Sequence, residues 1–267
     1  MSDNQILNED SVVKISGDTP TMRLFGLLEL IAAQDKQFSL QDLVNSTDLP
    51  KPTVHRMLQQ LENANMLIRD TDGRHYCVGG RLRRLAEDLL FNDTKYGARH
   101  ALLRALGSEL GESCNLTMLS GNEVLYLDRV ETDAPLRFYL GPGSRVPVHC
   151  SASGKVLLAQ MPPAQRKRLL EHVPFEVYTK NTIQSLEELE EEIEKVREQG
   201  YAFDNEEFLP GLFCVAVLVP RACGGRSNMA VATQAPIMRM TADKALAALP
   251  ALQRAAESLT KIEAQFD

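Results

Sequence analysis

This chain of 267 residues lacks long apolar runs, paired cysteine motifs and a hydrophobic leader, and each absence excludes a class of protein. The longest apolar run covers residues 212–219, whereas a membrane-spanning helix needs about 20 apolar residues. Residues 1–18 are polar and acidic, so we expect a disordered tail rather than a secretory signal. The five cysteines are scattered and never spaced CxxC, which indicates reduced thiols, a cytoplasmic location and no structural zinc site.

Catalytic motifs are also missing. There is no HExxH motif or metal-ligand cluster, and Gly154-Lys155 lacks the flanking residues of a phosphate-binding loop. Ser151 stands four residues before Lys155, which is one too many for a serine–lysine hydrolase. His149 and Cys150 are neighbours, and on an extended segment their side chains point in opposite directions. We therefore expect no catalytic residues, no cofactor and no metal.

The charge distribution points to an anionic partner in spite of a net charge of −7. Residues 49–84 contain seven basic and three acidic residues, a local excess of +4. The basic residues are Lys51, Arg56, Arg69, Arg74, Arg81, Arg83 and Arg84. A basic segment of this kind in an otherwise acidic chain is the electrostatic footprint of a nucleic-acid-binding domain.

The order of elements in residues 19–80 predicts a winged helix-turn-helix. Apolar residues from Leu24 to Ile31 mark a first helix, and Ser39 with Asp42 resembles a capping box that starts a short helix through Leu43. A turn at residues 45–48 precedes a third helix. Asp72-Gly73 then predicts a hairpin between strands at 67–69 and 75–78.

The third helix has the two faces of a DNA-recognition helix. Its apolar residues fall on one stripe, and its other face carries hydrogen-bonding side chains that reach bases or phosphates. The candidate DNA-binding residues are Lys51, Pro52, Thr53, His55, Arg56, Gln59 and, in the wing, Arg74. Arg56 has an equally good structural interpretation, in which it braces the helix, and the whole segment has one as a small packing domain with solvated basic residues.

The rest of the chain alternates between helical and strand patterns, so the predicted class is α+β. A linker helix over residues 81–91 places Leu82, Leu85, Leu89 and Leu90 inward. We expect a linker segment over 81–95 and a larger domain over 96–267. In that domain the patterns predict a helix ending at Gly111, a helix from Ser185 to Gly200, a helical tail from Thr241, and strands at 114–119, 124–130, 136–140, 201–203, 213–219 and 229–233.

Three segments in order give the chain a resemblance to a known family. They are Leu49-Pro50-Lys51-Pro52-Thr53-Val54-His55-Arg56, Val146-Pro147-Val148-His149-Cys150-Ser151-Ala152-Ser153-Gly154-Lys155, and Gly200-Tyr201-Ala202-Phe203-Asp204-Asn205-Glu206-Glu207. Over about residues 19–262 the chain resembles the IclR family of bacterial transcriptional regulators. The resemblance implies a winged helix-turn-helix, a linker helix and a GAF-like α/β effector-binding domain with an antiparallel-rich sheet. It also implies homodimers or homotetramers on pseudo-palindromic double-stranded DNA operators, where RNA polymerase is a further partner.

The segment 149–159 predicts an anion site. Small residues precede a helix there, and N–H groups at a helix start favour anions. The resemblance implies a small organic acid at this place, with polar contacts from Asp204, Cys214 and the strand before Pro236. That strand departs from the family pattern, because Ala232 and Gln234 stand where the family often has serines. The candidate effector-binding residues are Leu136, Phe138, Ala152, Ser153, Asp204, Cys214, Ala232 and Gln234.

Two of the candidate residues also have structural interpretations. Cys214 also reads as a small buried hydrophobe and Asp204 as a turn cap. We expect an aromatic carboxylate as effector of a regulator of catabolic genes, with a short oxo-acid such as glyoxylate as the alternative. A different class of function is a small-molecule sensor whose first domain docks a protein partner instead of DNA.

Overall fold

The computed structural model describes residues 19–32, 37–70, 73–91 and 96–264. The predicted disordered tail and Asp72 lie outside these ranges. The chain divides into two compact units, residues 1–89 and 90–267, and each is described by itself. Among the described helices, none is both long and apolar enough to cross a membrane.

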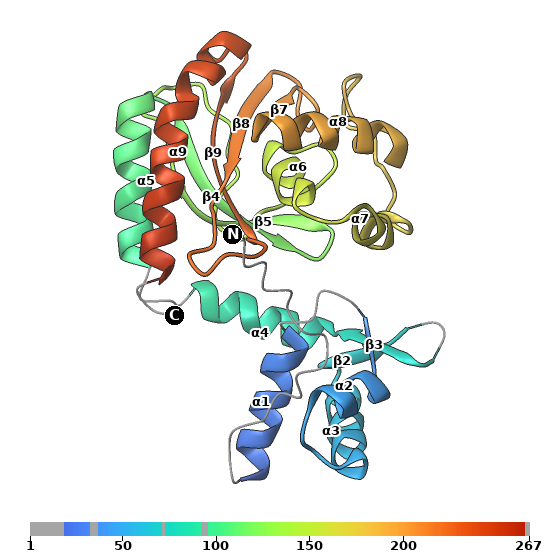
Figure 1. Cartoon of the computed structure of the whole chain (residues 1–267). Helices are drawn as coiled ribbons and strands as arrows, with labels where there is room; N and C mark the ends of the chain where they lie inside the picture. The colour runs from blue at the N-terminus through green and yellow to red at the C-terminus, as the bar shows by residue number, and fades with distance from the viewer. Residues whose placement is uncertain (1–18, 33–36, 71–72, 92–95, 265–267) are drawn as a thin grey trace, which may run out of the picture. The chain divides into compact units, whose positions relative to one another are not determined.

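The first unit combines helices with a small sheet (Figure 1). Its elements are α1 (Pro20–Ala32), β1 (Phe38–Ser39), α2 (Leu40–Ser46), α3 (Lys51–Asn63), β2 (Leu67–Arg69), β3 (His75–Val78) and α4 (Gly80–Phe91). The antiparallel sheet has the order β1-β3-β2. The predicted strands of the wing are confirmed, while the two-residue strand β1 was not predicted because it is too short to show alternation.

Local sequence signals start the helices of this unit where they were expected. The Ser39 side chain accepts a hydrogen bond from the Asp42 N–H, and the Asp42 carboxylate accepts one from the Ser39 N–H, which confirms the capping box. The helix then runs to Ser46, three residues beyond the predicted end at Leu43. The correction follows from Thr47, whose hydroxyl donates to the Leu43 carbonyl and supports one more turn.

The apolar stripe of α4 corrects one expectation. Leu82 is half-buried, but Leu85 and Leu89 are 47% and 65% exposed rather than inward. Within the described residues the chain does not cover these two leucines. The side chain of Leu90 lies outside the described residues.

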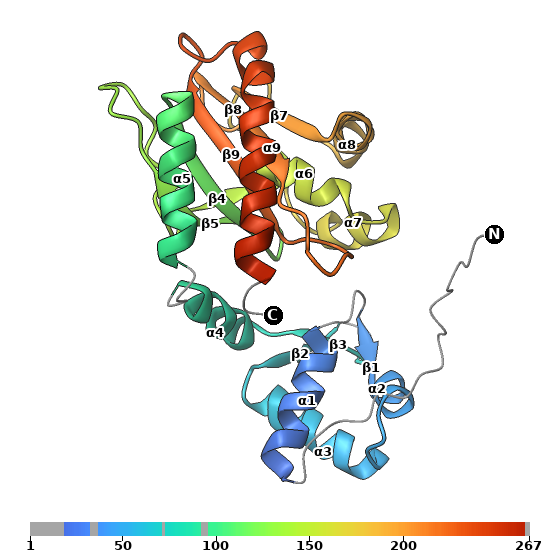
Figure 2. The same cartoon turned by 60° about the vertical axis from the view of Figure 1, so that its left-hand side comes forward.

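The second unit is a three-layer arrangement around one six-stranded antiparallel sheet of order β6-β5-β4-β9-β8-β7. Its strands are β4 (Ser113–Ser120), β5 (Glu123–Val130), β6 (Arg145–Pro147), β7 (Tyr201–Asn205), β8 (Leu212–Leu218) and β9 (Met229–Pro236). Its helices are α5 (Tyr96–Leu110), α6 (Ala152–Ala159), α7 (Pro163–Leu170), α8 (Leu186–Gln199) and α9 (Ala242–Ala264). Helices α5 and α9 lie side by side on one face of the sheet, as both views show (Figures 1 and 2). Helices α6 and α8 contribute to the core on the other face.

Strand alternation divides the core of this unit in two. Leu116 of β4 and Val215 of β8 belong to the cluster with α5 and α9, whereas Cys214 belongs to the cluster with α6 and α8. Helix α8 begins at the side-chain cap of Ser185 and ends at Gly200 with a φ of +80°, as predicted. The predicted strand at 136–140 is wrong, because those residues form an irregular segment.

Candidate functional site

Helix α3 separates its residues into a buried stripe and an exposed face. Val54, Met57, Leu58 and Leu61 are all buried in the core of the first unit. Six of the candidate DNA-binding residues lie on the same helix: Lys51, Pro52, His55, Arg56 and Gln59 are exposed, and Thr53 is half-buried. The helix is therefore oriented by its apolar stripe, and its row of donors faces outward.

The wing lies beside the start of this helix. Arg74 is exposed and follows Gly73, whose φ of +68° favours glycine in the hairpin turn. Lys51, His55 and Arg74 line one surface groove of about 270 Å³. The groove thus joins the basic residue of the wing to two side chains of the recognition helix.

Arg69 has a structural role in this unit. Its Nε donates to Glu62 at 2.8 Å, and its guanidinium lies 4.9 Å from the centre of the Tyr76 ring. These contacts fix the wing strand β2 against α3. The local positive charge available to a partner consequently comes from the other basic residues of the segment.

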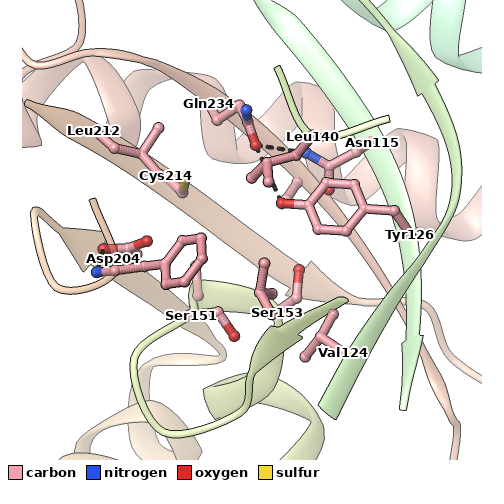
Figure 3. A pocket seen from close by; sticks show the side chains of 14 residues that line it. Asn115, Val124, Tyr126, Leu140, Ser151, Ser153, Asp204, Leu212, Cys214 and Gln234 are labelled. Atoms are coloured by element: carbon pink, nitrogen blue, oxygen red, sulfur yellow. Dashed lines mark hydrogen bonds between the residues drawn. The ribbon is translucent and has the colours of Figure 1, made fainter. Parts of the chain in front are cut away.

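The second unit has a cavity of about 20 Å³ between the sheet and the start of α6 (Figure 3). It is lined by Asn115, Val124, Tyr126, Leu140, Val146, Ser151, Ala152, Ser153, Asp204, Phe208, Leu212, Cys214, Ala232 and Gln234. Six of the candidate effector-binding residues are in this set: Ala152, Ser153, Asp204, Cys214, Ala232 and Gln234. The cavity gathers residues far apart in the sequence, as a ligand site must.

The start of α6 forms one wall of the cavity. The Ser151 hydroxyl accepts a hydrogen bond from the Gly154 N–H at 3.2 Å and donates to the Pro147 carbonyl at 2.8 Å. The N–H groups of Ala152 and Ser153 belong to the same first turn, where no intrahelical acceptor exists. This wall therefore offers backbone donors and the positive end of a helix dipole to a bound anion.

Asp204 closes the cavity on the β7 side. One of its carboxylate oxygens accepts hydrogen bonds from the N–H groups of Glu207 and Phe208, at 2.8 and 3.3 Å. Burial and the nearby Glu207 carboxylate raise the pKa of Asp204 to about 7. Asp204 therefore caps a turn and also lines the cavity, so the two interpretations are compatible.

The remaining wall is formed by polar side chains of β4, β5 and β9. Gln234 Oε1 accepts hydrogen bonds from Asn115 Nδ2 at 3.2 Å and from the Tyr126 hydroxyl at 3.3 Å (Figure 3). The sequence reasoning missed Asn115 and Tyr126. Alternation within β4 was an available signal, since it places the polar Asn115 and Thr117 on one face and Leu116 on the other.

Two expectations about the cavity need correction. Leu136 is 56% exposed, and neither it nor Phe138 lines the cavity. The physical reason is that this segment is not a strand, so its side chains do not alternate toward the sheet interior. Leu140 is the residue of this segment that reaches the cavity.

The sequence around Lys155 does not fit a phosphate-binding loop, and in the structure this lysine has another role. Its ammonium is fully buried, 2.6 Å from Glu207 and 3.5 Å from Glu192. Gly154 next to it is required by packing, since a Cβ there would lie 2.2 Å from the Val148 carbonyl oxygen. Residues 154–155 therefore hold α6 close to Glu207, which follows β7, and to Glu192 of α8.

His149 and Cys150 do not form a catalytic pair. The His149 ring packs on Phe175, with 5.0 Å between ring centres, and its Nε2 lies 3.2 Å from the Glu176 carbonyl oxygen. Burial raises the pKa of the Cys150 thiol far above its usual range. The described residues also bring no group of three His, Cys, Asp or Glu side chains together that would hold a metal ion.

Comparison with known proteins identifies relatives that match most of the chain. The chain is 45% identical over 240 residues, 90% of this chain and 95% of the other, to the protein named "Probable transcriptional regulator SauR" of Cupriavidus necator. It is 30% identical over 226 residues to the transcriptional repressor IclR of Escherichia coli, covering 82% of this chain and 80% of that one. The crystal structure of the Thermotoga maritima IclR has a TM-score of 0.60 and 26% identity, over 90% of this chain and 97% of that one.

The family descriptions match both units. Residues 20–71 match the IclR helix-turn-helix domain. Residues 97–261 match the C-terminal domain of bacterial transcriptional regulators of the IclR type. The chain therefore belongs to the IclR family, and it is a DNA-binding transcriptional regulator with an effector-binding C-terminal domain, not an enzyme.

Proposed function

We propose that this protein controls catabolic genes by binding a pseudo-palindromic operator through α3 and the wing, under the control of a compact organic acid. The observation that carries the DNA-binding part is the orientation of α3. Its apolar stripe is buried, while Lys51, His55 and Gln59 face outward next to Arg74. A helix exposed in this way fits the major groove, and a basic wing residue fits the phosphate backbone.

The cavity supports the choice of a compact acid. A volume of about 20 Å³ corresponds to roughly one water molecule, so any effector must displace lining side chains. The smallest acids require the smallest displacement, which favours the short-acid alternative over the aromatic carboxylate expected from the sequence. The anionic group is assigned to the start of α6, where Ala152 and Ser153 present backbone donors.

Control of DNA binding follows from differential affinity. The chain passes from one unit to the other within α4, whose exposed Leu85 and Leu89 fit an interface with a second copy of the chain. An acid that binds one arrangement of such a homodimer better than another shifts the populations of the two, and with them operator affinity.

A gel shift with the DNA upstream of the protein's own gene tests the DNA-binding part. The double variant Lys51→Ala/Arg56→Ala should lose the shift, because it removes two positive charges from the exposed face of α3. Lys167→Ala/Lys180→Ala is the matched control, as it removes two exposed positive charges from the second unit. If the double variant shifts DNA as the wild type does, α3 is not the contact. Failure of the wild type on every promoter fragment would favour the protein-docking alternative.

A further inference from the structure

The polar wall of the cavity contains hydrogen-bonding atoms that the described residues do not satisfy. Asn115 and Gln234 are 1% and 2% exposed. Asn115 Oδ1 and Gln234 Nε2 have no hydrogen-bond partner. A buried polar atom left without a partner destabilises the fold, because it has lost its hydrogen bonds to water and gained none in exchange. Gln234 Nε2 is a donor and could bind an anion. Asn115 Oδ1 is an acceptor and could not.

Arg129 of β5 is not one of the residues that line the cavity, but its place in the sheet puts it next to this wall. Arg129 lies directly opposite Asn115 in the antiparallel pair of β4 and β5. Because opposite residues of such a pair share a face of the sheet, Arg129 lies on the same face as Asn115. The pairing shifts by one residue between Leu116 and Thr117. This bulge turns Arg129 onto the cavity side of the sheet, whereas simple alternation from Tyr126 would have placed it on the other face.

The guanidinium of Arg129 is buried and incompletely paired. Its side chain is only 2% exposed, and its Nη2 donates to the Phe138 carbonyl. Its Nε and Nη1 have no hydrogen-bond partner among the described residues, and the Glu131 carboxylate lies 3.8 Å from Nε. Because a buried cation is costly unless it is paired, an oxyanion that reached these two donors would be stabilised by them.

The start of α6 and the polar wall that contains Gln234 lie on different sides of the cavity. Figure 3 shows Ser151 and Asp204 toward one side and Asn115, Tyr126 and Gln234 toward the other. We propose that the effector is a compact molecule with two acidic groups, one at the start of α6 and the second on Arg129 and the Gln234 amide. This inference rests on the proposed function, which needs only the first of these groups.

Calorimetric titration of the full-length chain tests the second group with three pairs of probes. The pairs are acetate and malonate, propionate and succinate, and butyrate and glutarate, and in each pair the second acid adds one terminal carboxylate. We expect at least one diacid to bind the wild type about 100-fold more tightly than its partner, in keeping with a buried, charge-assisted contact. Arg129→Gln should reduce that ratio to about threefold or less while leaving the affinity of the mono-acid unchanged.

Two further readouts separate ligand binding from a structural role. Arg145→Gln, the control, removes a cation that lies on the neighbouring strand β6 and bonds Ser120, and it should keep the preference for the diacid. Without ligand, Arg129→Gln should melt at the same temperature as the wild type or higher, because it removes an incompletely paired buried charge. A lower melting temperature with an intact diacid preference would overturn the assignment.

The outcomes also distinguish this inference from the proposed function. Equal affinity of the wild type for mono-acids and diacids would overturn the proposal of a second acidic group. The proposed anion site at the start of α6 would not be affected. If no acid of either kind binds the wild type, the organic-acid part of the proposed function fails together with it.

Discussion

Asp204 shows how one buried carboxyl group can link ligand binding to pH. Burial is the largest cause of its raised pKa of about 7, and the Glu207 carboxylate adds to it, while Lys155 opposes both. Below that pH the group is neutral and does not repel an anion at the start of α6. Above that pH, Asp204 is ionised and repels the anion of a bound acid.

The affinity for the acid should therefore fall as the pH rises through about 7. A bound anion raises the pKa of Asp204 further, so binding takes up a proton, and the dissociation constant rises by up to about tenfold per pH unit above the free pKa. Titrations between about pH 6.5 and 8.5, where the carboxyl groups of mono-acids and small diacids are largely ionised, measure this slope. The other charged groups near Asp204 are Glu207, Lys155 and Glu192, and the Cys214 thiol titrates far above this range.

Asp204→Asn is the control for that experiment. Its amide oxygen can still accept the N–H groups of Glu207 and Phe208, but it cannot ionise. The slope should disappear in this variant. The sign for stability follows from the same shift: the contribution of Asp204 is fully present below its unfolded pKa and is lost as the pH rises through about 7. An unchanged slope in Asp204→Asn would assign the pH dependence to another group.

Two residues of the first unit should respond differently to substitution. Arg74→Ala should weaken binding to all DNA sequences about equally and lower the slope of log affinity against log salt concentration by roughly one unit, because a phosphate contact releases counterions.

Gln59→Ala should lower the binding free energy for the operator by about 1–3 kcal/mol and change that for random DNA little, because a base contact carries the specificity. Fluorescence anisotropy at several salt concentrations measures both. Equal losses on operator and random DNA for Gln59→Ala would mean that it reads no base.

At the scale of elements, the start of α6 depends on a glycine. A Cβ at Gly154 would lie 2.2 Å from the Val148 carbonyl oxygen and 2.5 Å from the Val148 Cα, and both are backbone atoms that cannot yield cheaply. Gly154→Ala should therefore lower the free energy of unfolding by about 3 kcal/mol or more, through overpacking. Thermal or urea denaturation measures the loss.

Gly97→Ala is the matched control for that substitution. Gly97 also lies in a helix, α5, and a Cβ there would meet nothing within 4 Å. The replacement should be neutral or stabilising by up to about 1 kcal/mol, since alanine loses less conformational entropy than glycine. Similar stability losses in the two variants would show that the close approach at Gly154 is not the cause.

The elements of the first unit could be predicted because their signals are local. The capping box of Ser39 and Asp42, the buried stripe of α3 and the flanks of the hairpin are all read within a few residues. The antiparallel pair β4 and β5 and the capped helix α8 were found for the same reason. The three-residue strand β6, with Pro147 at its end, is too short to give a pattern.

The cavity could be predicted only in part. The start of α6 and Asp204, Cys214 and Gln234 came from chemistry and from family resemblance, but Leu136 and Phe138 were assigned to a strand that does not form. The orientation of Arg129, which does not line the cavity, could not be predicted either, because it depends on the register shift between Leu116 and Thr117. A one-residue irregularity in pairing is a tertiary property, and alternation along the strand alone gives the opposite face.

For the whole molecule, the uneven distribution of charge suits a regulator that must bind one site on DNA in preference to random sequence. The net charge is −7, while residues 49–84 carry an excess of +4. The acidic remainder limits attraction to random DNA, because non-specific affinity is mainly electrostatic. The basic segment retains enough local charge to position α3 and the wing.

We propose above all that an acid bound in the cavity of the second unit changes the affinity of the first unit for its operator. The most direct test measures the dissociation constant of the full-length chain for its operator, with and without an acid that calorimetry shows to be bound. We predict a change of about 5- to 150-fold, corresponding to a coupling free energy of about 1–3 kcal/mol. Ser153→Asp, which places a negative charge at the start of α6, should abolish both acid binding and this change. An operator affinity that stays constant while the wild-type cavity is saturated would contradict the account.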